Sequence, residues 1–194
     1  MKKISKNYIR IFITGLAVSL FLFFIVWGMK EGNGEKQTFH LSASWGYGYA
    51  DLEEITQKSD VIAIVKVDGE PIVETLDGIP YSEYPVRVST AILGVETKEL
   101  LRVYMTGGTT ENGDTIVMDD DPLFEKGIEY LIFAQKNDSG TITVLGGPQG
   151  RFVCDNGKVN SLHIYYEKPE QLLNFEINNQ NIDSVVDQVQ KYLK

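Results

Sequence analysis

The chain has 194 residues and a formal net charge of −9, but its charges are unevenly distributed. Residues 1–30 hold five Lys or Arg and no acid, so the rest carries 13 basic and 27 acidic side chains, a net charge of −14. A domain this acidic repels nucleic acid, which excludes nucleic-acid partners. Cys154 is the only cysteine, so no disulfide can form within the chain.

An uncharged apolar run at residues 11–29 follows a basic tail at residues 1–10. A helix of 19 residues is about 28 Å long, close to the roughly 30 Å hydrocarbon core of a bilayer. We therefore expect an uncleaved transmembrane anchor in the lipid bilayer; a cleaved signal peptide is the alternative, although its apolar core is usually shorter. The basic tail predicts a cytoplasmic N-terminus and a C-terminal domain outside the cell membrane.

Residues 30–50 are polar and rich in glycine, which predicts a flexible stalk. Within it Trp45, Tyr47 and Tyr49 alternate with glycines. These aromatic rings either pack on the neighbouring domain or on lipid headgroups, or they form an exposed patch for a possible interaction.

Residues 51–194 are expected to form one extracytoplasmic domain. The segment "DLEEITQKS" has the D-x-x-E pattern of a capping box and predicts a short helix at residues 51–59. Short β-branched runs then alternate with turn signals such as Asp77-Gly78 and Asn156-Gly157, as in an antiparallel sandwich or barrel. The last 14 residues place apolar side chains at helical spacing behind Asn181, which predicts an amphipathic C-terminal helix.

The pieces "DLEEITQKSDVIAIVKVDG", "YPVRVSTAILGVETKELLRVYMTGG", "LFEKGIEYLIFAQK" and "VLGGPQGRFVCDNGKV" resemble the OB-like small barrels of membrane-anchored or lipid-attached surface proteins of Gram-positive bacteria. The resemblance covers about residues 51–160. It implies a mainly β fold with a five-stranded Greek-key-type barrel, and it carries no catalytic motif to transfer. The chain differs from the lipid-attached members because it has an apolar span in place of a lipidation cysteine.

The glycine cluster "GGPQG" precedes a β-branched stretch instead of a helix and lacks the Gly-Lys-Ser/Thr ending, so phosphate binding is disfavoured. The residues after it predict a hairpin in which Cys154 faces Val159 and Asp155 faces Lys158, with His163 beyond the paired region. Cys154 is then a buried, inert thiol, not a nucleophile.

Asp119, Asp120 and Asp121 are weak candidates for a calcium site, because calcium prefers several carboxylate oxygens. Consecutive acids point in different directions on an extended chain, which favours a solvated acidic loop. His40 and His163 alone cannot hold zinc.

The sequence therefore predicts no catalytic residue, no cofactor site and no metal site. We expect a membrane-anchored binding or interaction module with an unknown extracytoplasmic protein or ligand as its partner. The alternatives are a cell-surface hydrolase with an unrecognised site and an inhibitor or immunity-type protein, the latter by analogy of fold alone.

Overall fold

Five strands close into a barrel in this computed structural model, which describes residues 36–42, 48–162 and 177–194. Around the barrel the strand order is β2–β4–β5–β9–β8 and back to β2. β5 and β9 run parallel, and the other four pairings are antiparallel. The bounds are β2 Val61–Val67, β4 Ile79–Leu93, β5 Leu100–Thr106, β8 Glu129–Lys136 and β9 Ile142–Val144. The expectation of a mainly β fold built on a five-stranded barrel is confirmed.

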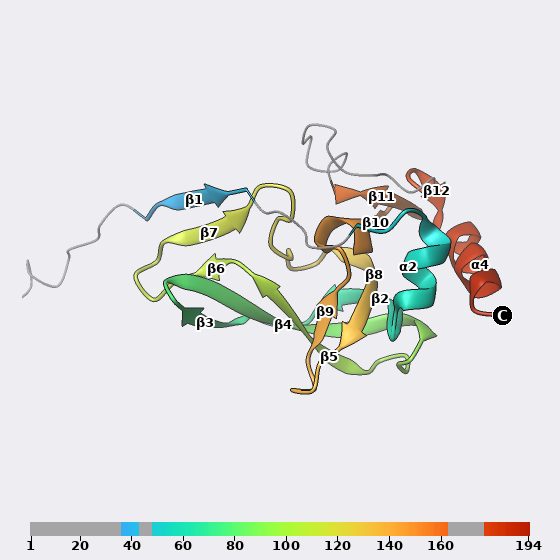
Figure 1. Ribbon diagram of the computed structural model, residues 1–194, viewed down its shortest axis with the longest axis horizontal. Helices are drawn as coiled ribbons and strands as arrows, with labels where there is room; N and C mark the ends of the chain where they lie inside the picture. The colour runs from blue at the N-terminus through green and yellow to red at the C-terminus, as the bar shows by residue number, and fades with distance from the viewer. Residues whose placement is uncertain (1–35, 43–47, 163–176) are drawn as a thin grey trace, which may run out of the picture. The chain divides into compact units, whose positions relative to one another are not determined.

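The remaining strands form two extensions of the barrel sheet and one separate sheet (Figure 1). A hairpin joins β3 to the first half of β4, the pair β10 and β11 continues the sheet beyond β8 to β12, and β1, β7 and β6 form a separate three-stranded sheet. Their bounds are β1 Thr38–Leu41, β3 Ile72–Leu76, β6 Gly108–Thr109, β7 Thr115–Met118, β10 Arg151–Asp155, β11 Lys158–Ser161 and β12 Gln180–Asn181.

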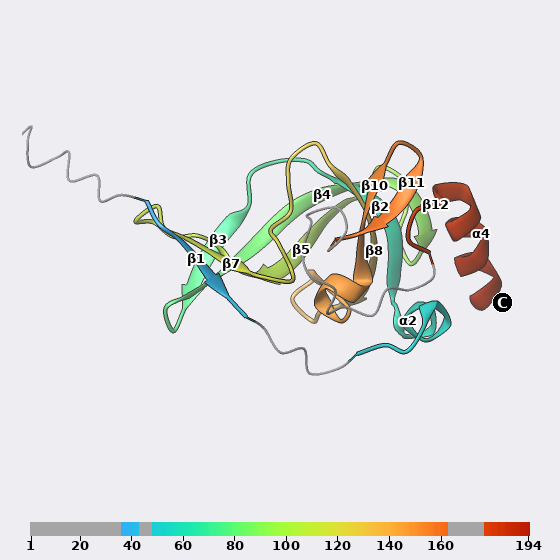
Figure 2. The ribbon, with the colours of Figure 1, turned by 90° about the horizontal axis from the view of Figure 1, so that it is seen from above.

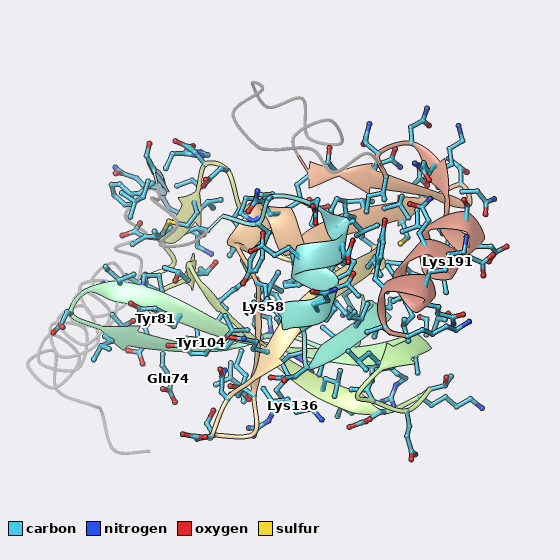
Figure 3. The ribbon with its side chains drawn as sticks, turned by 45° about the vertical axis from the view of Figure 1, so that its right-hand side comes forward. Lys58, Glu74, Tyr81, Tyr104, Lys136 and Lys191 are labelled. Carbon is cyan, nitrogen blue, oxygen red and sulfur yellow. The ribbon has the colours of Figure 1, made fainter. Side chains whose placement is uncertain are left out.

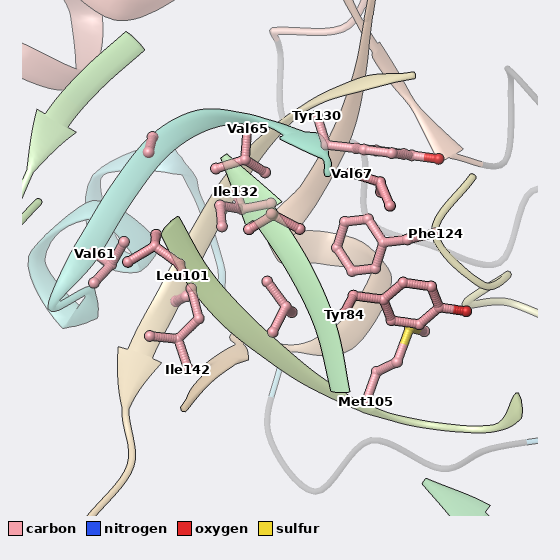
Figure 4. Packing of buried hydrophobic residues seen from close by; sticks show 14 of the residues in the cluster. Val61, Val65, Val67, Tyr84, Leu101, Met105, Phe124, Tyr130, Ile132 and Ile142 are labelled. Atoms are coloured by element: carbon pink, nitrogen blue, oxygen red, sulfur yellow. The ribbon is translucent and has the colours of Figure 1, made fainter. Parts of the chain in front are cut away.

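Apolar side chains form two cores, one on each face of β2 and β8. Alternate residues of both strands, such as Val65 and Ile132, fill the barrel interior (Figure 4). The residues between them, such as Ile64 and Phe133, point to the other side into a second core. Burial on both faces explains why β2 and β8 read as continuous apolar runs and do not alternate with polar residues.

Two helices cover the second core among the described residues: α2, Leu52–Lys58, and α4, Ile182–Tyr192. They lie beside each other at one end of the barrel domain (Figure 2). Asp51 caps α2 by accepting a hydrogen bond from the Glu54 amide at 2.8 Å, and Asn181 caps α4. Both predicted helices are confirmed.

The structure differs from the expected stalk at residues 38–41. These residues form β1, which pairs in parallel with β7 in the register Thr38 to Thr115. Gln37 strengthens this pairing, since its amide donates to Asp114 Oδ1 at 3.1 Å and its carbonyl accepts from the Thr115 amide. The barrel domain therefore begins at Gln37 and includes part of the expected stalk.

No helix within residues 36–42, 48–162 and 177–194 is both long and apolar enough to cross a bilayer. The expected anchor at residues 11–29 lies outside the described residues.

Candidate functional site

The strands β3, β4 and β5 form a sheet whose outer face is open. β5 and the part of β4 up to Val88 alternate: Tyr84, Val86 and Val103 point into the barrel, while the residues between them point outward. No helix or strand among the described residues packs on this outward side. We define the outer face by nine side chains: Ile72, Glu74, Leu76, Ile79, Tyr81, Glu83, Leu100, Arg102 and Tyr104.

Four of these nine side chains are large aliphatic groups exposed to solvent. Ile72 is 62% exposed, Leu76 63%, Leu100 54% and Ile79 36%. Single exposed apolar residues are ordinary on a protein surface, and Leu100, opposite Arg87 at the far end of the face, is one of them. Ile72, Leu76 and Ile79 lie together on the β3–β4 hairpin, and such a group on one sheet face is typical of an interaction site. The outer face is therefore the candidate functional site.

Two tyrosine rings stack at the centre of the outer face (Figure 3). Tyr81 and Tyr104 come from neighbouring strands in diagonal positions, and their rings lie nearly parallel, with centroids 5.5 Å apart. Reduced hydration, and then the neighbouring Tyr81 and Glu74, raise the pKa of Tyr104 above its usual 10.0. Its hydroxyl is therefore neutral at physiological pH and can both donate and accept a hydrogen bond.

The charged groups of the outer face lie next to the tyrosines. Arg102 donates a hydrogen bond to Glu83 Oε1 at 3.0 Å across β4 and β5. Glu74 stands opposite Tyr81 on β3. The nine side chains thus combine aromatic and aliphatic groups with the Arg102–Glu83 ion pair and the carboxylate of Glu74. This composition suits a partner that has both apolar and cationic groups.

A groove of about 1020 Å³ lies beside β3. One wall is formed by β3 residues, including Val73 and Thr75, and the other includes Phe39 of β1 and Ile116 of β7. We call this space the β3 groove.

Tyr49 of the expected interaction patch is buried in the second core, so packing on the neighbouring domain is the interpretation that holds for it. Gln149 fixes its backbone: the side-chain amide accepts from the Tyr49 amide at 3.0 Å and donates to the Tyr49 carbonyl at 3.3 Å. Trp45 and Tyr47 lie outside the described residues, and their role in an interaction stays a prediction.

The glycine cluster forms the turn between β9 and β10 through the 3-10 helix η1, Gly147–Gly150. Gly146 and Gly147 have φ values of 60° and 56°, a left-handed conformation that glycine adopts without strain. A Cβ on Gly150 would lie 2.3 Å from the Leu145 carbonyl oxygen, so only glycine fits there. The cluster turns the chain and presents Gln149 to Tyr49, and its residues 147–150 are buried, so it offers no open cradle to a phosphate.

Cys154 lies on β10, with Val159 opposite it on β11 and Asp155 opposite Lys158, so the predicted hairpin register is confirmed. Burial raises the pKa of the Cys154 thiol to about 12, and the nearby Glu129 carboxylate adds to this rise. A hydrogen bond with the Leu131 backbone opposes it. A thiol with this pKa is not a nucleophile near neutral pH. His163 lies outside the described residues.

Asp119 and Asp121 contact different partners and do not face a common site. Asp119 Oδ1 lies 3.1 Å from His40 Nδ1, and Asp121 Oδ1 accepts from the buried Arg151 at 2.6 Å. The expectation of a fully solvated acidic loop was wrong for Asp121, which is 7% exposed. Among the described residues, no three His, Cys, Asp or Glu side chains are grouped as a metal would need.

The outer face was not singled out by the sequence reasoning. The alternation along β4 is a signal for this face, but the sequence predicts no strand at residues 72–76, which complete the face as β3. Comparison with known proteins adds no functional residue, since no protein-family model matches the chain and no curated protein matches it either.

Proposed function

We propose that the chain is a single-pass membrane-anchored extracytoplasmic binding module without catalytic activity, and that it contacts its partner through the outer face. The observation that carries this proposal is that three exposed aliphatic side chains of the β3–β4 hairpin, Ile72, Leu76 and Ile79, lie beside the stacked Tyr81 and Tyr104. Water-exposed apolar area of this kind is stabilised when a partner covers it.

The barrel is OB-like in our proposal. Numbering β2, β4, β5, β8 and β9 as strands one to five gives the closed order 1–2–3–5–4, with strands three and five parallel. OB folds bind their ligands on the face of strands two and three and on the neighbouring loops. These strands correspond to β4 and β5, which form most of the outer face, and we extend the proposal to a likeness with surface barrels of Gram-positive bacteria.

The membrane anchor at residues 11–29 is supported by its length and by the basic tail before it. Protease treatment of intact protoplasts tests this arrangement. We expect the domain to be cleaved from outside while the tail is protected, and protection of the whole chain would contradict an extracytoplasmic domain.

Site-specific crosslinking in intact cells tests the binding face. A photo-crosslinking amino acid at Tyr104 should yield one defined adduct, whereas the same group at the exposed Asp187 of α4 should yield none. The Tyr104 adduct should also weaken when Ile72 is replaced by Ser. Equal adducts from both positions would show nonspecific proximity and would refute the assignment of the face; an adduct of twice the chain mass would identify a second copy instead of a partner.

A further inference from the structure

One edge of β3 has no neighbouring strand among the described residues. The inner edge pairs with β4, where Leu76 faces Ile79 across the two-residue Asp77-Gly78 turn. The two residues that flank a two-residue turn form a hydrogen-bonded pair, so Leu76 and Ile79 are bonded. Hydrogen-bonded and non-hydrogen-bonded pairs alternate along an antiparallel ladder, so the pairs at Glu74 and Ile72 are bonded as well.

Val73 and Thr75 occupy the non-hydrogen-bonded positions of that ladder. The partner of Thr75 is Pro80, which has no backbone N–H and fits only such a position. The backbone N–H and C=O groups of Val73 and Thr75 therefore point away from β4, along the open edge. This edge lies in the wall of the β3 groove.

β3 has few of the features by which proteins usually protect an open edge: Glu74 is its only charged residue, and Pro71 lies just before the strand. It has the sequence IVETL, with no lysine, no proline and a regular pairing register from Ile72 to Leu76. Its outward side chains Ile72 and Leu76 are exposed. An unprotected edge with apolar side chains is a template for an added strand.

The charges around the groove indicate what kind of strand fits. Its lining includes three acidic residues, Glu74, Glu111 and Asp114, and the described lining contains no Lys or Arg. Its apolar part includes Phe39 and Ile116. An occupant with apolar side chains and positive charge satisfies both properties of this wall.

A second copy of the chain fits this edge poorly. The only symmetric antiparallel pairing that uses all five residues of β3 places Glu74 directly opposite the Glu74 of the other copy. Like charges in directly opposed positions destabilise a strand pair.

We propose that the open edge of β3 binds an extended cationic segment of a partner by strand addition, with a Lys or Arg opposite Glu74 and apolar residues opposite Ile72 and Leu76. The added strand continues the outer face by one strand. This inference rests on the proposed binding function and names the partner chemistry for it.

The test uses the full-length protein in detergent and the fluorescent peptide Lys-Leu-Val-Lys-Val-Leu-Lys, with binding followed by anisotropy. Thr75→Pro removes an outward N–H and fills the edge, but it leaves the bonded pairs with β4 intact. Its matched control, Thr75→Val, keeps the N–H. We expect Thr75→Pro to weaken binding by at least about fivefold, the equivalent of one hydrogen bond, and Thr75→Val to bind as the parent does.

Charge is tested separately with Glu74→Gln, which should lower the affinity for the same peptide by about two- to fivefold. A peptide with glutamate in place of each lysine should not bind. Equal affinity of the Thr75→Pro and Thr75→Val variants, or no binding of the lysine peptide to the parent protein, overturns strand addition.

The two proposals fail in different ways. If the Tyr104 crosslink forms but Thr75→Pro changes neither the crosslink nor peptide binding, the outer face binds a partner and strand addition is wrong. If the Tyr104 crosslink is absent but peptide binding is lost in Thr75→Pro, the edge is a strand acceptor and the proposed function of the outer face is wrong. A Thr75→Pro variant that changes only self-association would assign the edge to a second copy and refute the inference.

Discussion

Replacement of Arg151 by Met should strongly destabilise the barrel while leaving its fold intact. Arg151 is 1% exposed and donates hydrogen bonds to the Asp121 carboxylate and to the Pro122 carbonyl. Its guanidinium also lies over the Phe124 ring, 4.3 Å from the centroid, and near Tyr130. It thereby ties the loop that places Phe124 in the barrel core to the start of β10.

The size of the effect follows from what the substitution leaves behind. Removing one partner of a buried ion pair costs about 3–5 kcal/mol, because the other charge stays buried without compensation. Methionine keeps most of the aliphatic packing, so a loss of about 4 kcal/mol is expected. For a domain of this size the loss corresponds to a fall in Tm of roughly 8–16 °C.

A double-mutant cycle with Asp121→Ala isolates the pair. If the ion pair is the cause, the double variant should be about 2–3 kcal/mol more stable than the sum of the single losses predicts, measured by urea unfolding. Additivity within about 0.5 kcal/mol would refute the reasoning, because Arg151 would then stabilise the fold through packing alone.

The pH dependence gives a second readout for the Arg151→Met variant. Burial raises the pKa of Asp121 above its usual 3.8, and Arg151 opposes that rise. Without Arg151 the pKa of Asp121 in the folded protein rises further. The buried Asp121 charge therefore destabilises the variant above this pKa, and the loss of stability disappears as the pH falls through it. The stability deficit of the variant should therefore be smaller at pH 5 than at pH 8, and a deficit that grows on acidification would contradict the assignment.

Three further predictions concern the turn before β10 and the hairpin that follows it. Gly150→Ala should destabilise the domain by about 1–3 kcal/mol in urea unfolding because its Cβ meets a backbone carbonyl, whereas Gly48→Ala, with only ordinary contacts, should change little; equal losses would contradict the steric argument. Cys154 is only half-buried, but with a pKa of about 12 it should react with a thiol reagent at pH 7.5 far more slowly in the native protein than after denaturation, and rapid labelling of the native protein would contradict the raised pKa. Gln149→Ala should lower the Tm through the loss of two hydrogen bonds to Tyr49, worth about 1–3 kcal/mol, and an unchanged Tm would show that Tyr49 is held by packing alone.

Local patterns were sufficient to predict much of the fold. The capping residues Asp51 and Asn181 marked the starts of both helices, and Asn156-Gly157 fixed the register of the β10–β11 hairpin. Each of these signals acts over a few residues, where turn and cap geometry depends little on the rest of the chain.

The remaining features depend on contacts between distant residues. Arg151 and Asp121 are 30 residues apart, and Gln149 and Tyr49 are 100 apart, so neither pair has a spacing that a sequence pattern reveals. β1 is short and exposed along its whole length, and it exists because β7 offers it a partner. The open edge of β3 likewise follows from which strands pair, a property of the closed barrel and not of the residues 72–76 alone.

The start of the domain at Gln37 links the fold to the proposed binding function. A domain starting at residue 51, as the sequence predicted, would lack Tyr49, which Gln149 holds in the second core, and β1, which pairs with β7. It would also lack Phe39, part of the wall of the β3 groove that faces the open strand edge. The segment expected to be only a tether therefore helps to form the proposed binding site, and binding measured on a domain cut at residue 51 would report on an incomplete groove.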